Sequence, residues 1–461
     1  MEFANAIIKY KDDIIRDVQR LVRIKSVDDT PQEGMPFGKG ISDALNEALQ
    51  ISRELGFSAH NLDGYAGYAE AGQGEEVVGI LVHLDVVPEG EGWEVDPYAA
   101  IINDGKIYGR GTSDDKAPAV ASLYALKAVL DSGAKLSKRV RVIFGTNEEK
   151  NCEGIQYYVK KEGHVDTGFT PDANFPLIHG EKAIMQGNFI FADNGPKNAP
   201  YLIDIKGGSA VNMVADQCEA TLCIADEHKL LKQFDDYLKK NAIEGQHSKA
   251  DQTIILKIFG KSSHGSRPEE GINAISHMAC FLSRIELNHG AEFAAAYCKK
   301  IGFAASGENM QLDMKDEFGS LTFCVGTVKM ENDDIIISSD IRYPITVKKN
   351  VVTSKITDAL KNTNIKYKLE HFKDAIYIEK DSYLVKILME AYIEVTKDTN
   401  SKPFTIGGGT YARAMKNILG FGMLFYGEKD TMHKKNEYVK IESLLKAAII
   451  YAEAIYRLAV Q

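Results

Sequence analysis

Apolar residues recur at the spacing of an α-helix in both end regions of the chain. Residues 5–24 and 41–55 carry Ile, Leu and Val at this spacing, and so do residues 384–395 and 441–455. Such a period places the apolar side chains along one face of a helix, which can then pack on a core. We therefore predict amphipathic helices over these four segments.

Two other segments are almost continuously apolar. Residues 77–87 (VVGILVHLDVV) and 139–149 (RVRVIFGTNEE) are rich in strand-forming residues, and residues 116–133 between them show helical spacing. Strands that are apolar on both faces are typical of parallel sheets covered by helices. This order predicts an α/β domain with a mostly parallel sheet flanked by helices.

The middle of the chain has a different pattern. Segments such as 218–224 and 253–259 alternate apolar and polar positions, as half-buried strands do, and amphipathic helices separate them. These features predict an inserted α+β domain. The strand, helix and strand of residues 218–259 have a faint counterpart in residues 335–377, which indicates a possible internal duplication of this domain.

Length and pattern together predict two domains. A chain of 461 residues is too long for one ordinary hydrophobic core. We place the α/β domain in two parts, residues 1–184 and residues 381–461, and the inserted domain at residues 185–380.

Charge and composition exclude several kinds of partner. The chain has 55 basic and 65 acidic residues, and its net charge of -10 works against binding a phosphate backbone. The first residues lack the apolar core of a secretion signal, and no apolar run reaches the roughly 18 to 20 residues that span a bilayer. We expect a cytoplasmic protein without nucleic-acid or membrane partners.

The cysteines are scattered along the chain. They form no C-x-x-C pair, so we predict reduced thiols, as in a reducing compartment, at all six positions: Cys152, Cys218, Cys223, Cys280, Cys298 and Cys324.

Candidate chemistry begins where the first apolar strand ends. His83 and Asp85 follow that strand, and the carboxyl ends of parallel strands are where α/β sheets place ligands. His83 can bind a metal ion through one ring nitrogen, and Asp85 can hold the other. A lone histidine at such a position is more often structural, so the pair needs support from other residues.

Further acidic residues and a second histidine lie in later loops: Asp114, Asp115, Glu148, Glu149, Asp172 and His433. An aspartate pair before a helix is equally typical of an N-cap. Two adjacent glutamates at a sheet edge repel each other, and a cation could neutralise one while the other exchanges protons. Two imidazoles with three carboxylates, one of them bridging, suit two divalent metal ions such as zinc.

The order of these residues resembles the di-zinc exopeptidase family of carboxypeptidase G, aminoacylase, succinyl-diaminopimelate desuccinylase, carnosinase and bacterial dipeptidases. Four signatures carry the resemblance: H-x-D at 83–85, G-R-G-x-x-D-x-K at 109–116, Glu-Glu at 148–149 and H-x-x-N-E at 433–437. One departure is Ala117, where the family usually has glycine. The likeness covers the whole chain and is greatest to the monomeric bacterial dipeptidases that cleave Xaa-His and similar dipeptides.

The resemblance implies a complete set of metal ligands. His83 and Asp172 would bind one ion, Glu149 and His433 the other, and Asp114 would bridge both. The cofactors would be two divalent ions per chain, with zinc expected first and manganese or cobalt as alternatives.

The resemblance also implies catalytic roles in both domains. Asp85 would orient His83, Glu148 would act as the general base, and His264 of the inserted domain would stabilise the oxyanion. The inserted domain would then act as a lid that closes over the substrate.

Residues of the shared phrases SAVNMV, DIR and GGGTY imply a substrate site. Asn212 and Arg342 would hold the carboxyl end of the substrate, and Gly409 and Thr410 would contact it. An aspartate at position 172 is more typical of dipeptidases and aminopeptidases in this family, whereas glutamate goes with carboxypeptidases and acylases.

The expected activity is therefore hydrolysis of dipeptides or very short peptides. An N-acyl-amino-acid amidohydrolase with the same metal centre is the nearest alternative, and a non-catalytic metal-binding homologue is a second, against which Glu148 argues. We expect a monomer, because the two similar units of the long lid could replace the surface that shorter relatives obtain from a partner subunit.

Overall fold

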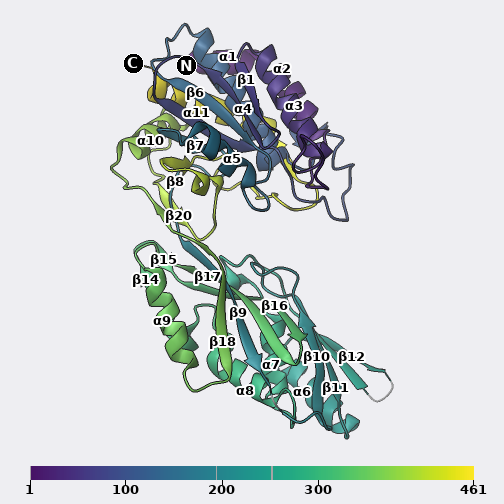
Figure 1. Cartoon of the computed structure of the whole chain (residues 1–461). Helices are drawn as coiled ribbons and strands as arrows, with labels where there is room; N and C mark the ends of the chain where they lie inside the picture. The colour runs from purple at the N-terminus through teal and green to yellow at the C-terminus, as the bar shows by residue number, and fades with distance from the viewer. Residues whose placement is uncertain (1, 194, 251–252, 461) are drawn as a thin grey trace. The chain divides into compact units, whose positions relative to one another are not determined.

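The computed structural model describes residues 2–193, 195–250 and 253–460, and the chain divides into two compact units. Unit 1 is formed by three segments and unit 2 by an insertion with one short return segment (Figure 1). The segments of unit 1 are Met1–Gly180, Tyr377–Thr405 and Gly409–Gln461, and those of unit 2 are Glu181–Ile376 and Ile406–Gly408.

A nine-stranded sheet forms the centre of unit 1. Its strand order is β1 (Ser58–Leu62), β2 (Ala66–Ala71), β6 (Arg139–Gly145), β3 (Val77–His83), β7 (Thr167–Thr170), β21 (Ile418–Gly420), β8 (Ile178–Glu181) and β19 (Ile376–Tyr377), with β20 (Phe404–Ile406) paired to β8. The central pairs β6·β3, β3·β7 and β7·β21 are parallel, and the pairs on either side of them are antiparallel. Every residue of β3 is buried, as its unbroken apolar run predicts.

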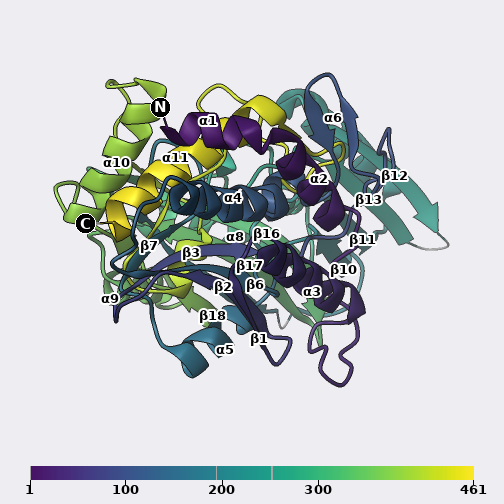
Figure 2. The ribbon, with the colours of Figure 1, turned by 90° about the horizontal axis from the view of Figure 1, so that it is seen from above.

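Helices cover both faces of this sheet. Val78, Ile80 and Val82 of β3 join one core with α4 (Ala117–Asp131) and α11 (Ile441–Ala459), which lie side by side in Figure 2. Successive strand residues point to opposite faces, so Arg141 of β6, in register with Gly79, lies on the other face. There it donates a 2.9 Å hydrogen bond to Tyr158 of α5 (Glu153–Glu162).

The remaining helices of unit 1 flank the same core: α1 (Glu2–Lys9), α2 (Lys11–Val22), α3 (Lys39–Glu54) and α10 (Tyr383–Thr396). The continuous helical spacing over residues 5–24 predicts one helix, and this is wrong, because the chain is not helical at Tyr10 (φ -87°, ψ 4°). Both helices still pack on the core through Ile7 of α1 and Ile14, Val18 and Leu21 of α2, whereas Ile8 is 60% exposed.

A small three-stranded sheet connects two distant loops of unit 1. Its order is β22 (Tyr438–Lys440), β5 (Lys106–Tyr108) and β4 (Ile101–Asn103). The β5 strand leads into the π-helical turn η1 (Thr112–Lys116), and the β22 strand follows the segment that contains His433. Antiparallel pairing of β5 with β22 therefore holds these two segments together.

Unit 2 is built on an eight-stranded antiparallel sheet. The strand order is β12 (Glu244–Ala250), β13 (Thr253–Phe259), β11 (Gln217–Cys223), β10 (Tyr201–Gly207), β16 (Thr322–Glu331), β17 (Asp334–Tyr343), β9 (Ala183–Ala192) and β18 (Ile365–Lys373). Its helices are α6 (Glu227–Asn241), α7 (Ala274–Leu282), α8 (Ala291–Lys300) and α9 (Lys349–Leu360).

The two halves of this sheet match each other in topology. The path β11, α6, β12 ends on one edge strand, and the path β17, α9, β18 ends on the other. The sequence echo of residues 218–259 and 335–377 includes these paths, but its first part extends through β13, whereas the strand that matches β18 in topology is β12. The predicted fold class, an α/β domain with a mostly parallel sheet and an inserted α+β domain, is confirmed.

The prediction that all cysteines are reduced is wrong for one pair. Cys280 of α7 and Cys298 of α8 form a disulfide across a sequence separation of 18 residues. The packing of α7 against α8 brings them together, which their spacing in the sequence does not reveal. The other four cysteines, all within the described residues, are not disulfide-bonded.

Across the described parts of the chain, no helix combines the length and the apolar character needed to cross a membrane.

Candidate metal centre

The ends of three parallel strands meet at one edge of the unit 1 sheet. His83 is the last residue of β3 and lies in register with Gly145, the last residue of β6. Glu148 and Glu149 follow β6, and Asp172 follows the end of β7. The sheet thus places four candidate residues from distant parts of the chain at its carboxyl edge.

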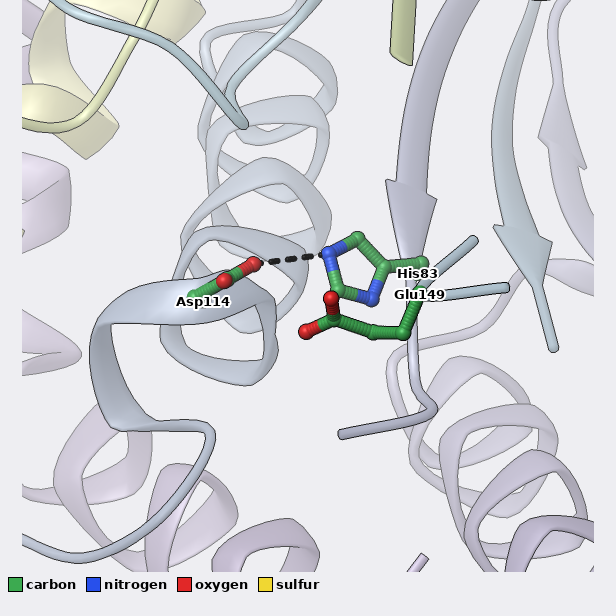
Figure 3. A group of neighbouring side chains, drawn as sticks. All are labelled: His83, Asp114 and Glu149. Atoms are coloured by element: carbon green, nitrogen blue, oxygen red, sulfur yellow. Dashed lines mark hydrogen bonds and ion pairs between the residues drawn. The ribbon is translucent and has the colours of Figure 1, made fainter. Parts of the chain in front are cut away.

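Asp114 lies between the two candidate histidines. Its Oδ1 is 2.8 Å from Nε2 of His83 (Figure 3), and its Oδ2 is 2.8 Å from Nε2 of His433. His433 Nε2 also lies 3.2 Å from Oε1 of Glu149. Because the two oxygens of one carboxylate face two different imidazoles, Asp114 has the position that a ligand shared by two cations requires.

Two overlapping groups of donor atoms surround this point. His83, Asp114 and Glu149 form one group (Figure 3), and His83, Glu148 and Asp172 form the other. Within each group the donor atoms lie within 4.8 Å of one another. The structure therefore brings together all five predicted ligands and Glu148. Because Glu148 is a member of the second group, its carboxylate also has the position of a metal ligand.

The Asp114–Asp115 pair does not cap the following helix. The N-cap of α4 is Lys116, and no side chain caps it. Asp115 is fully buried, and its Oδ2 accepts a 3.2 Å hydrogen bond from the backbone N–H of His83. The N-cap interpretation of these aspartates is therefore excluded, and Asp115 instead supports the backbone of His83.

Asp85 contacts His83 through a different atom from the one the sequence suggests. The carbonyl oxygen of Asp85 lies 3.0 Å from His83 Nδ1, whereas its carboxylate Oδ1 lies 3.6 Å away. A carbonyl can only accept, so Nδ1 carries a proton and the Nε2 lone pair is left for a cation. The carboxylate is engaged elsewhere, because its oxygens accept the N–H groups of Glu148 (3.1 Å) and Glu149 (3.0 Å).

The buried carboxylates of this cluster raise each other's pKa. Burial, together with the charge of Asp114, raises the pKa of Asp172 to about 7. Burial, with a further contribution from Asp172, raises the pKa of Glu148 to about 8, although His83 opposes the rise. The positive charges within the cluster therefore do not balance the negative charges of its carboxylates.

The same imbalance acts on His433. Burial lowers its pKa, but hydrogen bonds to Asp114 and Glu149 outweigh burial and raise it to about 11. Burial raises the pKa of Asp114, but its contacts with His433 and His83 outweigh this and lower it below its usual range. The acids draw positive charge onto the imidazoles, and divalent cations would supply that charge instead, so the donor set fits metal ions.

The predicted oxyanion residue lies in a polar cluster of unit 2. His264 Nδ1 faces the hydroxyl of Ser266 at 2.7 Å and the backbone N–H of Ser266 at 3.4 Å. The backbone N–H of Ser266 faces Nδ1 and the guanidinium of Arg342 faces Nε2, and both groups can only donate, so these contacts do not fix which ring nitrogen carries the proton. Arg342 Nη2 lies 3.5 Å from Nε2 of His264, so the guanidinium and the imidazole are neighbours within unit 2.

Arg342 is held from two sides within unit 2. Its Nε donates to Asp340 (2.7 Å), its Nη1 donates to the carbonyl of Gly407 (2.8 Å), and Gln186 donates to the second oxygen of Asp340 (2.8 Å). Sequence reasoning gave no role to Gln186 or Asp340. Asp340 stands two positions before Arg342 on one strand, and this spacing puts both side chains on the same face, so the sequence could have indicated their contact. Gln186 lies on a different strand, and no spacing in the sequence indicates its contact with Asp340.

The other three predicted substrate residues are divided between the two units. The carbonyl of Asn212 accepts a 2.7 Å hydrogen bond from the N–H of Gly265, so Asn212 belongs to the His264 cluster. Gly409 and Thr410 belong to unit 1. The hydroxyl of Thr410 accepts a hydrogen bond from the N–H of Ala412 and caps a short 3₁₀ helix.

Comparison with known proteins identifies the family of the chain. A model of the peptidase family M20/M25/M40 matches residues 79–457. The Bacillus subtilis protein named "Putative dipeptidase YtjP" is 38% identical over 468 residues, which cover 100% of each chain.

Solved structures share the fold at low sequence identity. Human carnosine dipeptidase 1 matches with a TM-score of 0.58 and 14% identity over 99% of this chain and 98% of its own. The Bacillus subtilis protein YXEP, described as a dinuclear metal-binding peptidase, matches with a TM-score of 0.52 and 10% identity over 98% and 99%. From the family match and the full-length relative, the chain belongs to the peptidase family M20/M25/M40.

Proposed function

We propose that this chain is a metal-dependent dipeptidase that hydrolyses dipeptides or very short peptides. The observation that carries the proposal is the position of Asp114 between His83 and His433, with the acidic residue Glu148 beside the same cluster. The names of the Bacillus relative and of human carnosine dipeptidase 1 support the choice of substrate class. We further propose that it acts as a monomer in the cytoplasm.

Two divalent ions per chain fit the donor set. His83 and Asp172 would hold one, Glu149 and His433 the other, and Asp114 would contact both. Zinc suits this mixture of imidazole and carboxylate, with manganese or cobalt as alternatives. When bound, a pair of such ions polarises the peptide carbonyl and lowers the pKa of water from about 15.7 towards about 7.

Glu148 has the position of a proton carrier. Its donor atom lies with those of His83 and Asp172 in one group, and a carboxylate at such a point can act as a general base. We propose that its carboxylate takes a proton from the attacking water and later gives it to the leaving amine. The N–H bonds to Asp85 fix the backbone that carries this carboxylate.

Unit 2 supplies donors for the negative charges of the substrate. His264 Nε2–H would meet the oxyanion that develops on the peptide carbonyl. Arg342 would bind the terminal carboxylate, with Asn212 beside it, because a guanidinium matches the geometry of a carboxylate. His264 Nε2 and Arg342 Nη2 lie 3.5 Å apart, so the two groups proposed to bind the substrate are neighbours.

The alternative activity is hydrolysis of N-acyl amino acids by the same metal centre. We expect the purified, metal-loaded protein to hydrolyse unmodified dipeptides faster than the N-acetylated form of the amino acid that each dipeptide carries at its carboxyl end. The measurement is kcat/KM for matched pairs, with the Glu148→Ala variant as the blank. Faster turnover of the N-acetyl compounds would identify an amidohydrolase, and no turnover of either would favour a non-catalytic homologue.

A further inference from the structure

Three charged residues of the sequence signatures have no part in the proposed chemistry. Arg110 is 2% exposed, and Lys116 and Glu437 are fully buried. Arg110 and Lys116 belong to the G-R-G-x-x-D-x-K signature, and Glu437 ends the H-x-x-N-E signature. Burial of a charge costs several kcal/mol unless the charge is paired and hydrogen-bonded. The hydrogen-bond partners of these three side chains therefore indicate their structural role.

Glu437 joins both signatures with one carboxylate. Its Oε2 accepts a 2.6 Å hydrogen bond from Arg110, which is 327 residues away in the sequence. Its Oε1 accepts the backbone N–H of Ser113 at 2.8 Å and that of Asp114 at 3.3 Å. The carboxylate therefore holds the backbone of the residue whose side chain lies between the two histidines.

Backbone contacts continue the connection. The N–H of Gly109 donates to the carbonyl of Glu437 at 2.9 Å, and Tyr108 pairs with Tyr438 in the β5·β22 ladder. His433 lies in the segment just before β22. The segment of Asp114 and the segment of His433 are thus fixed to each other, and not only to the sheet.

Lys116 anchors the far side of the Asp114 segment. Its Nζ donates to the carbonyl oxygen of Leu21 (3.1 Å), in the last turn of α2, and to that of Ile24 (2.7 Å), just after α2. Arg110 has a similar second function, because its Nη2 donates to the carbonyl of Glu89 at 3.2 Å. Asp114 therefore lies between an anchor at Arg110–Glu437 and an anchor at Lys116.

We propose that Glu437, paired with Arg110, is a positioning residue for the metal centre. It fixes the backbone at Asp114, so that the two oxygens of the Asp114 carboxylate stay directed at His83 and His433 before any ion binds. The inference rests on the proposed function, because it takes these three residues as metal ligands. Glu437 itself contacts neither substrate nor ion in this account.

The test is Glu437→Gln, measured as metal affinity of the metal-free protein by competition with a chelator, using Zn²⁺ and Mn²⁺ in separate titrations. Glutamine keeps the shape of the side chain, but its amide nitrogen cannot accept a hydrogen bond, so either Arg110 or the N–H groups of Ser113 and Asp114 lose their acceptor. We expect affinity to fall by about 10- to 100-fold, the usual effect of removing a residue that orients a ligand.

Glu70→Gln is the matched control. Glu70 accepts a 2.5 Å hydrogen bond from the buried Arg141 in the same unit, so this variant also takes one carboxylate away from a buried arginine. It should bind metal like the wild type. If Glu437→Gln fails to fold, Arg110→Lys replaces it, because lysine keeps the charge but loses the second contact of the guanidinium, and metal binding should again weaken.

The outcomes separate the positioning role from the proposed function. A Glu437→Gln variant that unfolds at lower temperature but binds both metals with wild-type affinity would overturn the positioning role, since Glu437 would then only stabilise the fold, and the proposed function would stand. Wild-type affinity in Arg110→Lys would have the same meaning. Wild-type protein that binds neither metal would overturn both.

Discussion

Replacing Glu148 with alanine is expected to lower kcat for dipeptides by about 10²- to 10⁴-fold, the usual contribution of a general acid or base. The carboxylate would no longer take the proton of the attacking water or return it to the leaving amine. Metal content should stay at the wild-type value, because the five other donor residues remain. The measurements are steady-state kinetics and metal analysis of the same preparation.

Glu149→Ala is the matched comparison for this variant. Glu149 is the next residue along the chain and is held by the same carboxylate, that of Asp85, but it contacts His433 at 3.2 Å. We expect this variant to lose metal together with activity. If Glu148→Ala also loses metal, Glu148 is a ligand, as its grouping with His83 and Asp172 allows, and the general base has to be sought elsewhere.

His264→Ala should lower kcat by about 10²- to 10³-fold, the range found when one oxyanion donor is removed. The proposed hydrogen bond from the ring of His264 to the carbonyl oxygen strengthens only as negative charge develops on that oxygen. KM should therefore change much less than kcat. Metal content should stay the same, since no predicted ligand lies in unit 2.

His247→Ala provides the control for this experiment. His247 is an exposed histidine on the edge strand β12 of the same unit, and its replacement should leave kcat unchanged. If His264→Ala keeps a near-normal kcat, unit 2 does not supply the oxyanion donor. The proposed assembly of the active site from both units would then have to be abandoned.

The site could be predicted as far as residue type and strand order carry information. His83 and Glu148–Glu149 end two apolar strands, and this pattern alone places them at the carboxyl edge of a sheet. Asp172 and His433 follow no comparable pattern, so the sequence could group them with His83 only through the family resemblance. Local rules left Asp114 undecided between ligand and N-cap. The structure excludes the N-cap and places the carboxylate between two imidazoles, while the ligand role stays a proposal.

What the sequence could not show are contacts between a side chain and a distant backbone. The carboxylate of Asp85 accepts the N–H groups of Glu148 and Glu149, and the carboxylate of Glu437 accepts those of Ser113 and Asp114. Every non-proline residue has a backbone N–H, so the sequence does not show which N–H groups donate to a given carboxylate. The roles of Asp85 and Glu437 therefore depend on tertiary structure.

Two errors about the fold have similar physical causes. The break at Tyr10 leaves the apolar spacing on both sides intact, so the pattern of residues 5–24 gives no sign of it. The Cys280–Cys298 disulfide depends on how α7 packs against α8, which neither cysteine's local sequence determines. The parallel sheet core and the inserted domain were predictable because long apolar and alternating runs encode them directly.

The central claim, a dipeptidase with a two-ion centre, is tested most directly by adding metal stepwise to the metal-free protein while dipeptide turnover is measured. We predict no turnover after chelation and a rate that rises to a plateau at about two ions per chain, because two imidazoles and three carboxylates exceed the needs of one tetrahedral site. A plateau at one ion per chain, or dipeptide turnover that persists without metal, would contradict the account.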